Sequence, residues 1–151
     1  MLELINKRLD EPELRELLSY AVFPDEDVLN AVIEQYRTEP ELRLYGYLEE
    51  GVWIGVIGCA QDQEMPDALR VRHMAIAPDE RGLGYGRGII LKLLAMEKPA
   101  MLMADADAEG AEFYRNIGFS VMSTGENAFG AKGASEQFVC IFHAEEEETE
   151  E

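Results

Sequence analysis

The sequence predicts a mixed α/β fold, in which one twisted, mostly antiparallel sheet carries helices on both faces. Four segments repeat apolar residues at helical spacing, and branched or aromatic runs of strand length lie between and after them. The two kinds of segment follow one another without an internal repeat. A chain of 151 residues with 47% apolar composition can build one core. We therefore expect residues 1–144 to form a single domain.

The first part of the chain is expected to hold two helices. Asp10 and Glu13 have the spacing of a helix-start box, Pro12 suits a first turn, and leucines at helical spacing predict a helix near 11–20. A second helix is expected after Pro24, where three consecutive acidic residues complement the positive end of the helix dipole.

The remaining segments predict strands and two further helices. Glu49-Glu50-Gly51 joins the first two strands as a hairpin. A glycine-rich turn leads from the third strand into a helix, and Gly118 is expected to end the last helix in a left-handed cap. The expected strands are 42–48, 52–60, 69–77, 100–104, 120–123 and 137–142. One expected helix follows the glycine-rich turn and carries Ile89, Ile90, Leu93 and Leu94 on one face, and the other spans 108–117.

Charge and composition disfavour several classes of partner. The net charge is -18, from 13 Lys and Arg against 31 Asp and Glu, which disfavours nucleic acid and anionic membranes and favours cations. The acidic tail 145–151 is expected to be disordered. No run reaches membrane-spanning length and the N-terminus mixes charges, so we expect a cytoplasmic protein. Cys59 and Cys140 lie in strand-like segments without metal-ligand spacing, so buried free thiols are expected, with a disulfide or a nucleophilic thiol as alternatives.

The glycine-rich turn Arg81-Gly82-Leu83-Gly84-Tyr85-Gly86-Arg87-Gly88 is the most informative segment. Glycine lets a backbone approach a ligand closely, and the first amides of a helix have no internal partner. With two arginines beside it, such a turn suits a diphosphate. The spacing excludes a GxxxxGK loop, and it excludes GxGxxG because the third glycine position falls on Arg87 or Ile89.

The segment from Met74 to Gly86 resembles the hallmark of the GNAT superfamily of acyl-coenzyme A dependent N-acyltransferases. That hallmark is a strand ending in Leu-Ala-Val-x-Pro, then two residues, then Arg or Gln-x-x-Gly-x-Gly or Ala at the start of a helix. A second family motif, Asn-x-x-Ala-x-x-Phe-Tyr-x-x-x-Gly-Phe, is similar to the run from Asp107 to Phe119, where Asp107 and Gly110 depart from it.

The resemblance implies an N-acetyltransferase that uses acetyl-CoA as co-substrate, without a metal. An amine would attack the thioester directly in a ternary complex. The implied contacts to the cofactor are the pyrophosphate turn Arg81, Gly82, Leu83, Gly84, Tyr85, Gly86 and Arg87, and the backbone of Met74, Ala75 and Ile76, which would pair with the pantetheine arm like an added strand.

Two residues are candidates for proton transfer. The resemblance implies that Tyr114 protonates the leaving thiolate, and helical spacing predicts that Phe113 and Ile117 face the core while Tyr114 projects to an adjacent face. A structural tyrosine is the alternative. Many relatives carry a glutamate as base on the strand before the turn, but residues 70–74 contain no carboxylate. His73 has a suitable intrinsic pKa.

Two other interpretations of the base remain open, a histidine packed in the sheet and a water chain that ends at Glu64 or Asp62.

The acceptor is expected to approach over the first helices and the loop 127–135. It would be a primary amine on a small molecule or peptide, and the charge favours a cation such as a polyamine, an aminoglycoside or a basic peptide. The alternative function is a catalytically inactive acyl-CoA sensor or interaction module. Relatives often form homodimers, which makes a dimer an open expectation.

Overall fold

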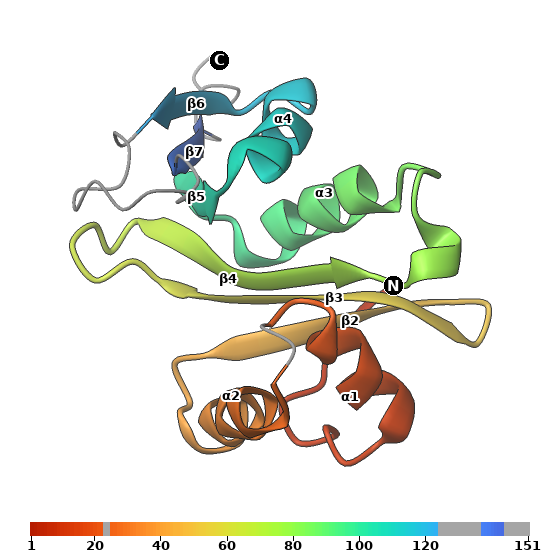
Figure 1. Cartoon of the computed structure of the whole chain (residues 1–151). Helices are drawn as coiled ribbons and strands as arrows, with labels where there is room; N and C mark the ends of the chain where they lie inside the picture. Colours follow the sequence, from red (N-terminus) through yellow and green to blue (C-terminus); the bar gives the residue numbers. More distant parts are fainter. Residues whose placement is uncertain (23–24, 124–136, 144–151) are drawn as a thin grey trace. The chain divides into compact units, whose positions relative to one another are not determined.

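The computed structural model describes residues 1–22, 25–123 and 137–143. The strand order is β1-β2-β3-β4-β5-β7-β6, and the pairs β1-β2, β2-β3, β5-β7 and β6-β7 are antiparallel. This arrangement confirms the predicted fold class (Figure 1). The elements are β1 (Leu2–Leu4), α1 (Pro12–Ser19), α2 (Glu26–Thr38), β2 (Arg43–Glu49), β3 (Val52–Gln61), β4 (Ala68–Ile76), a 3-10 turn η1 (Pro78–Glu80), α3 (Tyr85–Glu97), β5 (Met101–Ala106), α4 (Ala108–Asn116), β6 (Ser120–Ser123) and β7 (Phe138–His143).

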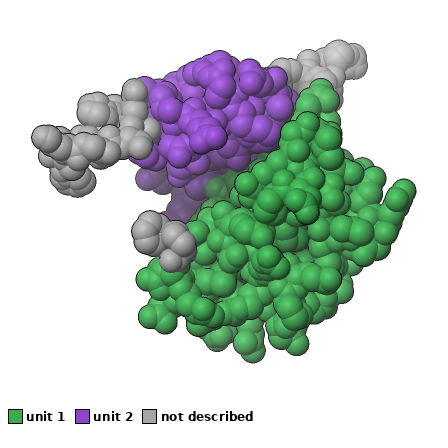
Figure 2. Space-filling model, turned by 45° about the vertical axis from the view of Figure 1, so that its right-hand side comes forward, with its two compact units in different colours: residues 1–61, 71–98 green, residues 62–70, 99–151 purple. Residues whose placement is uncertain are grey.

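Two compact units make up the chain (Figure 2). The first unit comprises residues 1–61 and 71–98, and the second comprises 62–70 and 99–151. Strand β4 begins in the second unit and continues in the first. The expected loop 127–135 and the acidic tail 145–151 lie outside the described residues, and the expectation of a single domain over 1–144 stays a prediction.

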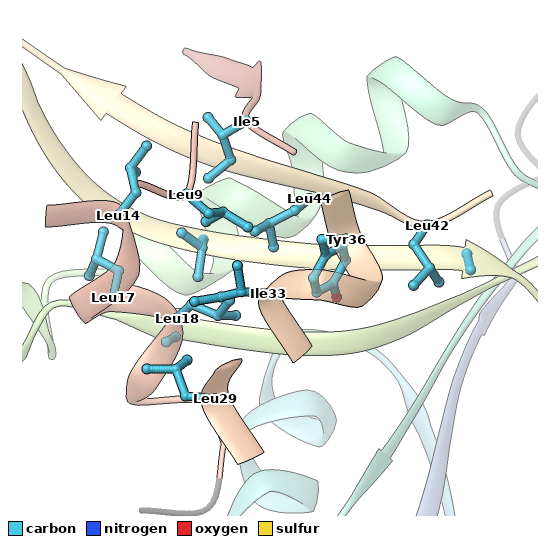
Figure 3. Close-up of a cluster of buried hydrophobic side chains, with 13 residues drawn as sticks. Ile5, Leu9, Leu14, Leu17, Leu18, Leu29, Ile33, Tyr36, Leu42 and Leu44 are labelled. Atoms are coloured by element: carbon cyan, nitrogen blue, oxygen red, sulfur yellow. The ribbon is translucent and has the colours of Figure 1, made fainter. Parts of the chain in front are cut away.

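In the first unit, α1 and α2 cover one face of the strands and α3 covers the other (Figure 1). The core on the α1 and α2 side gathers side chains from both helices, from β2 and β3 and from the connection after β1 (Figure 3). Its members are Ile5, Leu9, Leu14, Leu17, Leu18, Leu29, Ile33, Tyr36, Leu42, Leu44, Val56, Ala60 and Ala75. Burial of this apolar surface holds the two helices against the sheet.

The sequence interpretation missed β1. This strand has three residues, too few to display a period, and it exists because its backbone pairs with β2, with Leu2 opposite Tyr47 and Leu4 opposite Tyr45. The side chain of Leu2 is buried and that of Leu4 is exposed. A long-range pairing of this kind leaves no local signature.

The predicted start of α1 was only partly right. Pro12 occupies the first turn as expected, but the residue that caps the helix is Glu11, which makes no side-chain capping bond. The Asp10 to Glu13 box is therefore wrong. The carboxylate of Glu11 instead accepts a hydrogen bond of 2.8 Å from Nε of Arg8, and its backbone carbonyl accepts from the amides of Leu14 and Arg15.

Helix α3 is fixed at its far end to β2. The carboxylate of Glu97 accepts hydrogen bonds from Arg43 Nε at 2.7 Å and from the Tyr45 hydroxyl at 2.6 Å. Burial by itself would raise the pKa of Glu97, but these two donors hold it below its ordinary value, so the carboxylate is charged at neutral pH. The helix that opens at the glycine-rich turn is thus held at its other end by an ion pair.

In the second unit, α4 packs on β5, β6 and β7. The Asp107 side chain caps the helix by accepting from the Gly110 amide at 2.9 Å. Gly118, with φ of 107°, ends it as predicted, because its amide bonds to the Arg115 carbonyl and the next amide to that of Tyr114.

The predicted core face of α4 was wrong. The buried positions are Ala111 and Tyr114, whereas Phe113 and Ile117 are half-buried. Tyr114 packs against Phe113 and Phe119, with ring centroids 5.0 Å apart in both pairs. The aromatic ring of Tyr114 therefore belongs to the core of the second unit.

The described residues bear on the cysteines, on membrane-spanning helices and on clusters of metal ligands. Cys59 and Cys140 are free and buried, which confirms the expected thiols. Across residues 1–22, 25–123 and 137–143, no helix has both the length and the apolar character needed to span a bilayer. Within the same ranges, His, Cys, Asp and Glu side chains do not gather in threes as they would around a metal ion.

Candidate functional site

The glycine-rich turn connects β4 to α3 through two left-handed residues. After η1 and Arg81, Gly82 has φ of 80° and Gly84, the residue that caps α3, has φ of 90°. L-residues with a side chain rarely adopt this region, so these two glycines are required by the path of the chain. The helix starts at Tyr85, so the glycine-rich turn leads from β4 into a helix, as the sequence predicted.

The start of α3 leaves three backbone donors available. The amide of Gly88 bonds to the Gly84 carbonyl at 3.2 Å, so the preceding amides of Tyr85, Gly86 and Arg87 lie before the first helical hydrogen bond. A Cβ added at Gly82, Gly84 or Gly88 would meet no atom within 4 Å. The backbone is therefore open to a ligand, and free amides at the positive end of a helix dipole suit linked phosphates.

The two arginines of the turn are placed differently. Arg81 donates from Nε to the Ile76 carbonyl at 2.9 Å, and its guanidinium lies 5.7 Å from the centre of the Tyr20 ring. It therefore ties the turn back to the end of β4. Arg87 is exposed in the first turn of α3. A phosphate contact from either arginine stays a prediction.

Strand β4 is the last strand of the first unit in the sheet order, and its final residues are Met74, Ala75 and Ile76. On its inner side the Ala77 amide donates to the Ile54 carbonyl at 2.8 Å. At Gly55 an added Cβ would come 2.6 Å from the Ala75 carbonyl oxygen, so glycine permits close approach of the two strands. Pairing of the pantetheine arm with residues 74–76 stays a prediction.

The imidazole of His73 is packed against α2. Its Nδ1 lies 2.7 Å from the hydroxyl of Tyr36, and the two rings meet edge to face with centroids 5.5 Å apart. Burial, and next to it the positive charge of Arg72, lowers the pKa of His73 to about 4. The imidazole is therefore neutral at physiological pH.

Of the two carboxylates offered as an alternative base, Asp62 already serves a structural purpose in the second unit. Its Oδ1 accepts from Arg70 Nε at 2.8 Å, and its other oxygen accepts the backbone amides of Glu64 and Met65. The hydrogen bond from Arg70 is the largest influence and holds the pKa of Asp62 below its ordinary value. Arg70 also pairs with Asp105 at 2.8 Å, so its charge is shared between two carboxylates.

Burial raises the pKa of the Tyr114 phenol well above its ordinary value, with a smaller contribution from Cys140. Tyr114 is 7% exposed. The phenol therefore keeps its proton throughout the physiological range, which is the form that a proton donor needs.

A cavity of about 400 Å³ lies in the first unit, beside the turn that carries the glycines. Its lining combines three carboxylates with two aromatic rings, and comes from α1, the β2-β3 hairpin and the start of η1. The lining residues are Glu13, Glu16, Leu17, Tyr20, Gly51, Val52, Trp53, Ala77, Pro78 and Asp79. Carboxylates beside aromatic faces suit an organic cation.

Sequence reasoning missed Tyr36 as the partner of His73, because Tyr36 was assigned to the apolar face of a helix. It also missed the role of Gly58, where a Cβ would collide with the Tyr36 hydroxyl. An isolated glycine in a strand can signal such a close approach, but it does not name the partner.

Comparison with known proteins agrees with this geometry. The sequence profile of the acetyltransferase (GNAT) domain matches residues 9–133. No protein in the curated set matches the chain.

Three solved structures have the same fold at low sequence identity. A protein assigned to the GNAT family from Desulfovibrio desulfuricans is 15% identical, with a TM-score of 0.77 over 95% of this chain and 98% of its own. A spermidine N-acetyltransferase mutant from Vibrio cholerae is 14% identical, with a TM-score of 0.71 over 95% and 94%. A Bacillus subtilis acetyltransferase in complex with CoA is 16% identical, with a TM-score of 0.72 over 95% and 97%.

Proposed function

We propose that this chain, which belongs to the GNAT family of acetyltransferases, transfers the acetyl group of acetyl-CoA to a primary amine. The amine would attack the thioester directly while both substrates are bound. The observation that carries the proposal is the turn before α3, where Gly82 and Gly84 hold left-handed conformations and open amides begin the helix.

Acetyl-CoA supplies the activated thioester, and the residues of this chain fit its diphosphate. The amides of Tyr85, Gly86 and Arg87 would donate to the phosphate oxygens, because they precede the first helical hydrogen bond and lie at the positive end of α3. The remaining turn residues Arg81, Gly82, Leu83 and Gly84 would surround them, and Met74 to Ile76 would hold the pantetheine arm along β4.

Tyr114 is the proposed acid that returns a proton to the departing thiolate. Support comes from its protonation state, since burial keeps the phenol protonated at neutral pH. His73, on β4 directly before Met74, is the second residue proposed to take part in the transfer. The proton that leaves the amine has to reach water or another group.

The proposed acceptor is a cationic amine, of which a polyamine is the simplest test case. Two observations support this class: the net charge of -18 and the cavity lined by Glu13, Glu16 and Asp79 beside Trp53 and Tyr20. A neighbouring solved structure is a spermidine N-acetyltransferase, which adds polyamines to the amines that merit testing.

The deciding experiment measures CoA thiol release from acetyl-CoA with a panel of amines, together with calorimetry of CoA binding. We expect tight CoA binding and turnover that is highest with diamines and polyamines. CoA binding without thiol release for any amine would instead support the inactive sensor or interaction module. Absence of CoA binding would reject the proposal as a whole.

A further inference from the structure

We propose that the hydroxyl of Tyr36 holds His73 as its Nε2–H tautomer, so that His73 acts in acetyl transfer as a hydrogen-bond donor and not as the proton acceptor. Both residues belong to the first unit, Tyr36 on α2 and His73 on β4 directly before Met74. Tyr36 would thus be a positioning residue that acts through His73.

The two side chains form a short hydrogen bond, and the hydroxyl that takes part in it belongs to a buried tyrosine. Tyr36 is 1% exposed, and its hydroxyl oxygen lies 2.7 Å from His73 Nδ1. The chain makes room for this hydroxyl on the neighbouring strand, because any Cβ at Gly58 would collide with it. The side chain of Tyr36 enters the core from α2, as its stick drawing shows (Figure 3).

The direction of the hydrogen bond follows from the number of protons available. A buried phenol that donates to nothing is strongly unfavourable, and Nδ1 of His73 is the acceptor that the structure provides at this hydroxyl. A neutral imidazole carries a single N–H. If Nδ1 accepts from Tyr36, that proton resides on Nε2.

The surroundings favour the neutral ring. Facing the imidazole are the Tyr36 phenol from α2 and the Arg72 guanidinium on the same strand, and the Cys59 thiol from β3 lies near the phenol. Burial raises the pKa of the phenol and of the thiol, so neither supplies a negative charge that would stabilise an imidazolium. The one charge among them, on Arg72, repels a proton from His73.

This tautomer limits what His73 can do. The unprotonated nitrogen of the ring is Nδ1, and its lone pair already accepts the hydrogen bond from Tyr36. The ring therefore has no site left to accept a proton from an amine. The Nε2–H can donate to a carbonyl oxygen or to water. The amine proton would then leave through water toward a carboxylate or bulk solvent.

The size of the kinetic effect separates the two roles. Loss of one neutral hydrogen bond corresponds to roughly a 2- to 10-fold change. Loss of a general base corresponds to roughly 10²- to 10⁴-fold. A substitution that removes only Nε2–H can therefore tell a donor from a base.

The tautomer is tested by long-range proton-nitrogen NMR of the imidazole rings between pH 5 and 8. The chain has two histidines, so a His143→Gln variant assigns the signals. We expect the Nε2–H pattern for His73 in the wild type. In Tyr36→Phe, which removes only the donor, we expect a mixture of tautomers. An Nδ1–H pattern in the wild type, or a pattern that Tyr36→Phe leaves unchanged, would overturn the assignment.

The role in catalysis is tested with His73→Asn and His73→Gln. Asparagine can offer an acceptor near the place of Nδ1, so it keeps a partner for Tyr36 but has no group that titrates. For His73→Asn we expect kcat/KM to fall by roughly 2- to 10-fold, with the pH profile unchanged in shape. A fall of 10²-fold or more, with loss of the acidic limb of the profile, would make His73 the base. His73→Gln, which lacks the near acceptor, should be less stable than His73→Asn.

The kinetic part rests on the proposed acetyl transfer, whereas the tautomer does not. A chain that shows the Nε2–H pattern but transfers no acetyl group would reject the proposed function and uphold the assignment for Tyr36. An active enzyme with an Nδ1–H imidazole would reject the tautomer assignment and uphold the proposed function. The two failures can therefore be told apart.

Discussion

Burial sets the protonation state of both candidates for proton transfer. Tyr114 and His73 were both candidates for proton transfer, and desolvation shifts their pKa values in opposite directions. It raises the pKa of the phenol and lowers that of the imidazole, since in each case the charged form is the one disfavoured. Tyr114 thus remains a proton donor at neutral pH, while His73 becomes a weak base.

A first prediction concerns Tyr114. Replacement by Phe keeps the packing against Phe113 and Phe119 and removes the hydroxyl, so kcat should fall by roughly 10²- to 10⁴-fold if the phenol is the acid. Steady-state kinetics with a diamine acceptor measure this effect. The dissociation constant of CoA should stay unchanged, and full turnover with intact CoA binding would mean that the tyrosine is purely structural.

A second prediction concerns the pH dependence of stability at His73. Its pKa falls from 6.5 in the unfolded chain to about 4 in the fold, so between these values the unfolded chain binds more protons. This contribution to stability is present above pH 6.5 and is lost as the pH falls toward 4. The loss of unfolding free energy is at most roughly 3–4 kcal/mol, taking about 1.4 kcal/mol for each pH unit between the two pKa values.

Urea unfolding at pH 7.5 and pH 5 measures this dependence. The wild type should lose more stability between the two values than His73→Asn, which cannot titrate. Equal losses in both proteins would show that His73 protonates as easily in the fold as in the unfolded chain. Carboxylates common to both proteins cancel in the comparison.

Among the elements, α3 connects the site to the framework of the first unit. Glu97 fixes its last turn to Arg43 and Tyr45, and Gly84 caps its first turn in a left-handed conformation. A helix held at one end presents its opposite end in a defined place. The amides that we propose to bind the diphosphate are therefore held in position before the ligand arrives.

The third prediction tests Gly84 against a matched glycine in the same helix. Gly84→Ala places a side chain at φ of 90°, which should destabilise the protein by about 1–2 kcal/mol and weaken CoA binding. Gly88→Ala lies within the helix with open space around its Cβ, so it should stabilise the fold by roughly 0.5–1 kcal/mol. Thermal unfolding and calorimetry of CoA binding measure both changes. Equal effects of the two substitutions would contradict the required left-handed cap.

For the molecule as a whole, the excess of acidic residues sets the long-range potential. A net charge of -18 attracts cationic acceptors and repels acetyl-CoA, so binding of the anionic cofactor has to rely on local donors at the start of α3. Surface charges act over about 8 Å at physiological ionic strength, and salt weakens them. The cavity beside η1 concentrates part of this charge.

The fourth prediction is that Glu13→Gln with Glu16→Gln raises KM for a diamine by roughly 2- to 10-fold, because two surface carboxylates near the bound cation are lost. Added salt should raise KM for the diamine in the wild type, and do so less in the variant. Glu39→Gln with Glu41→Gln changes the net charge equally, at two residues of the first unit that are outside the lining of the cavity, and serves as the control. An equal rise in KM for the control pair would assign the effect to net charge alone.

The order of most elements and the place of the glycine-rich turn could be predicted from the amino-acid sequence, because apolar periodicity and turn residues are local properties. The left-handed cap at Gly118 was likewise predicted from its own neighbours in the chain. The pairing of β1 and the burial of Tyr114 became visible in the folded chain alone. The same holds for the contact of His73 with Tyr36, 37 residues away in the chain. Burial and hydrogen-bond partners depend on which surfaces meet, and residues distant in sequence supply those surfaces.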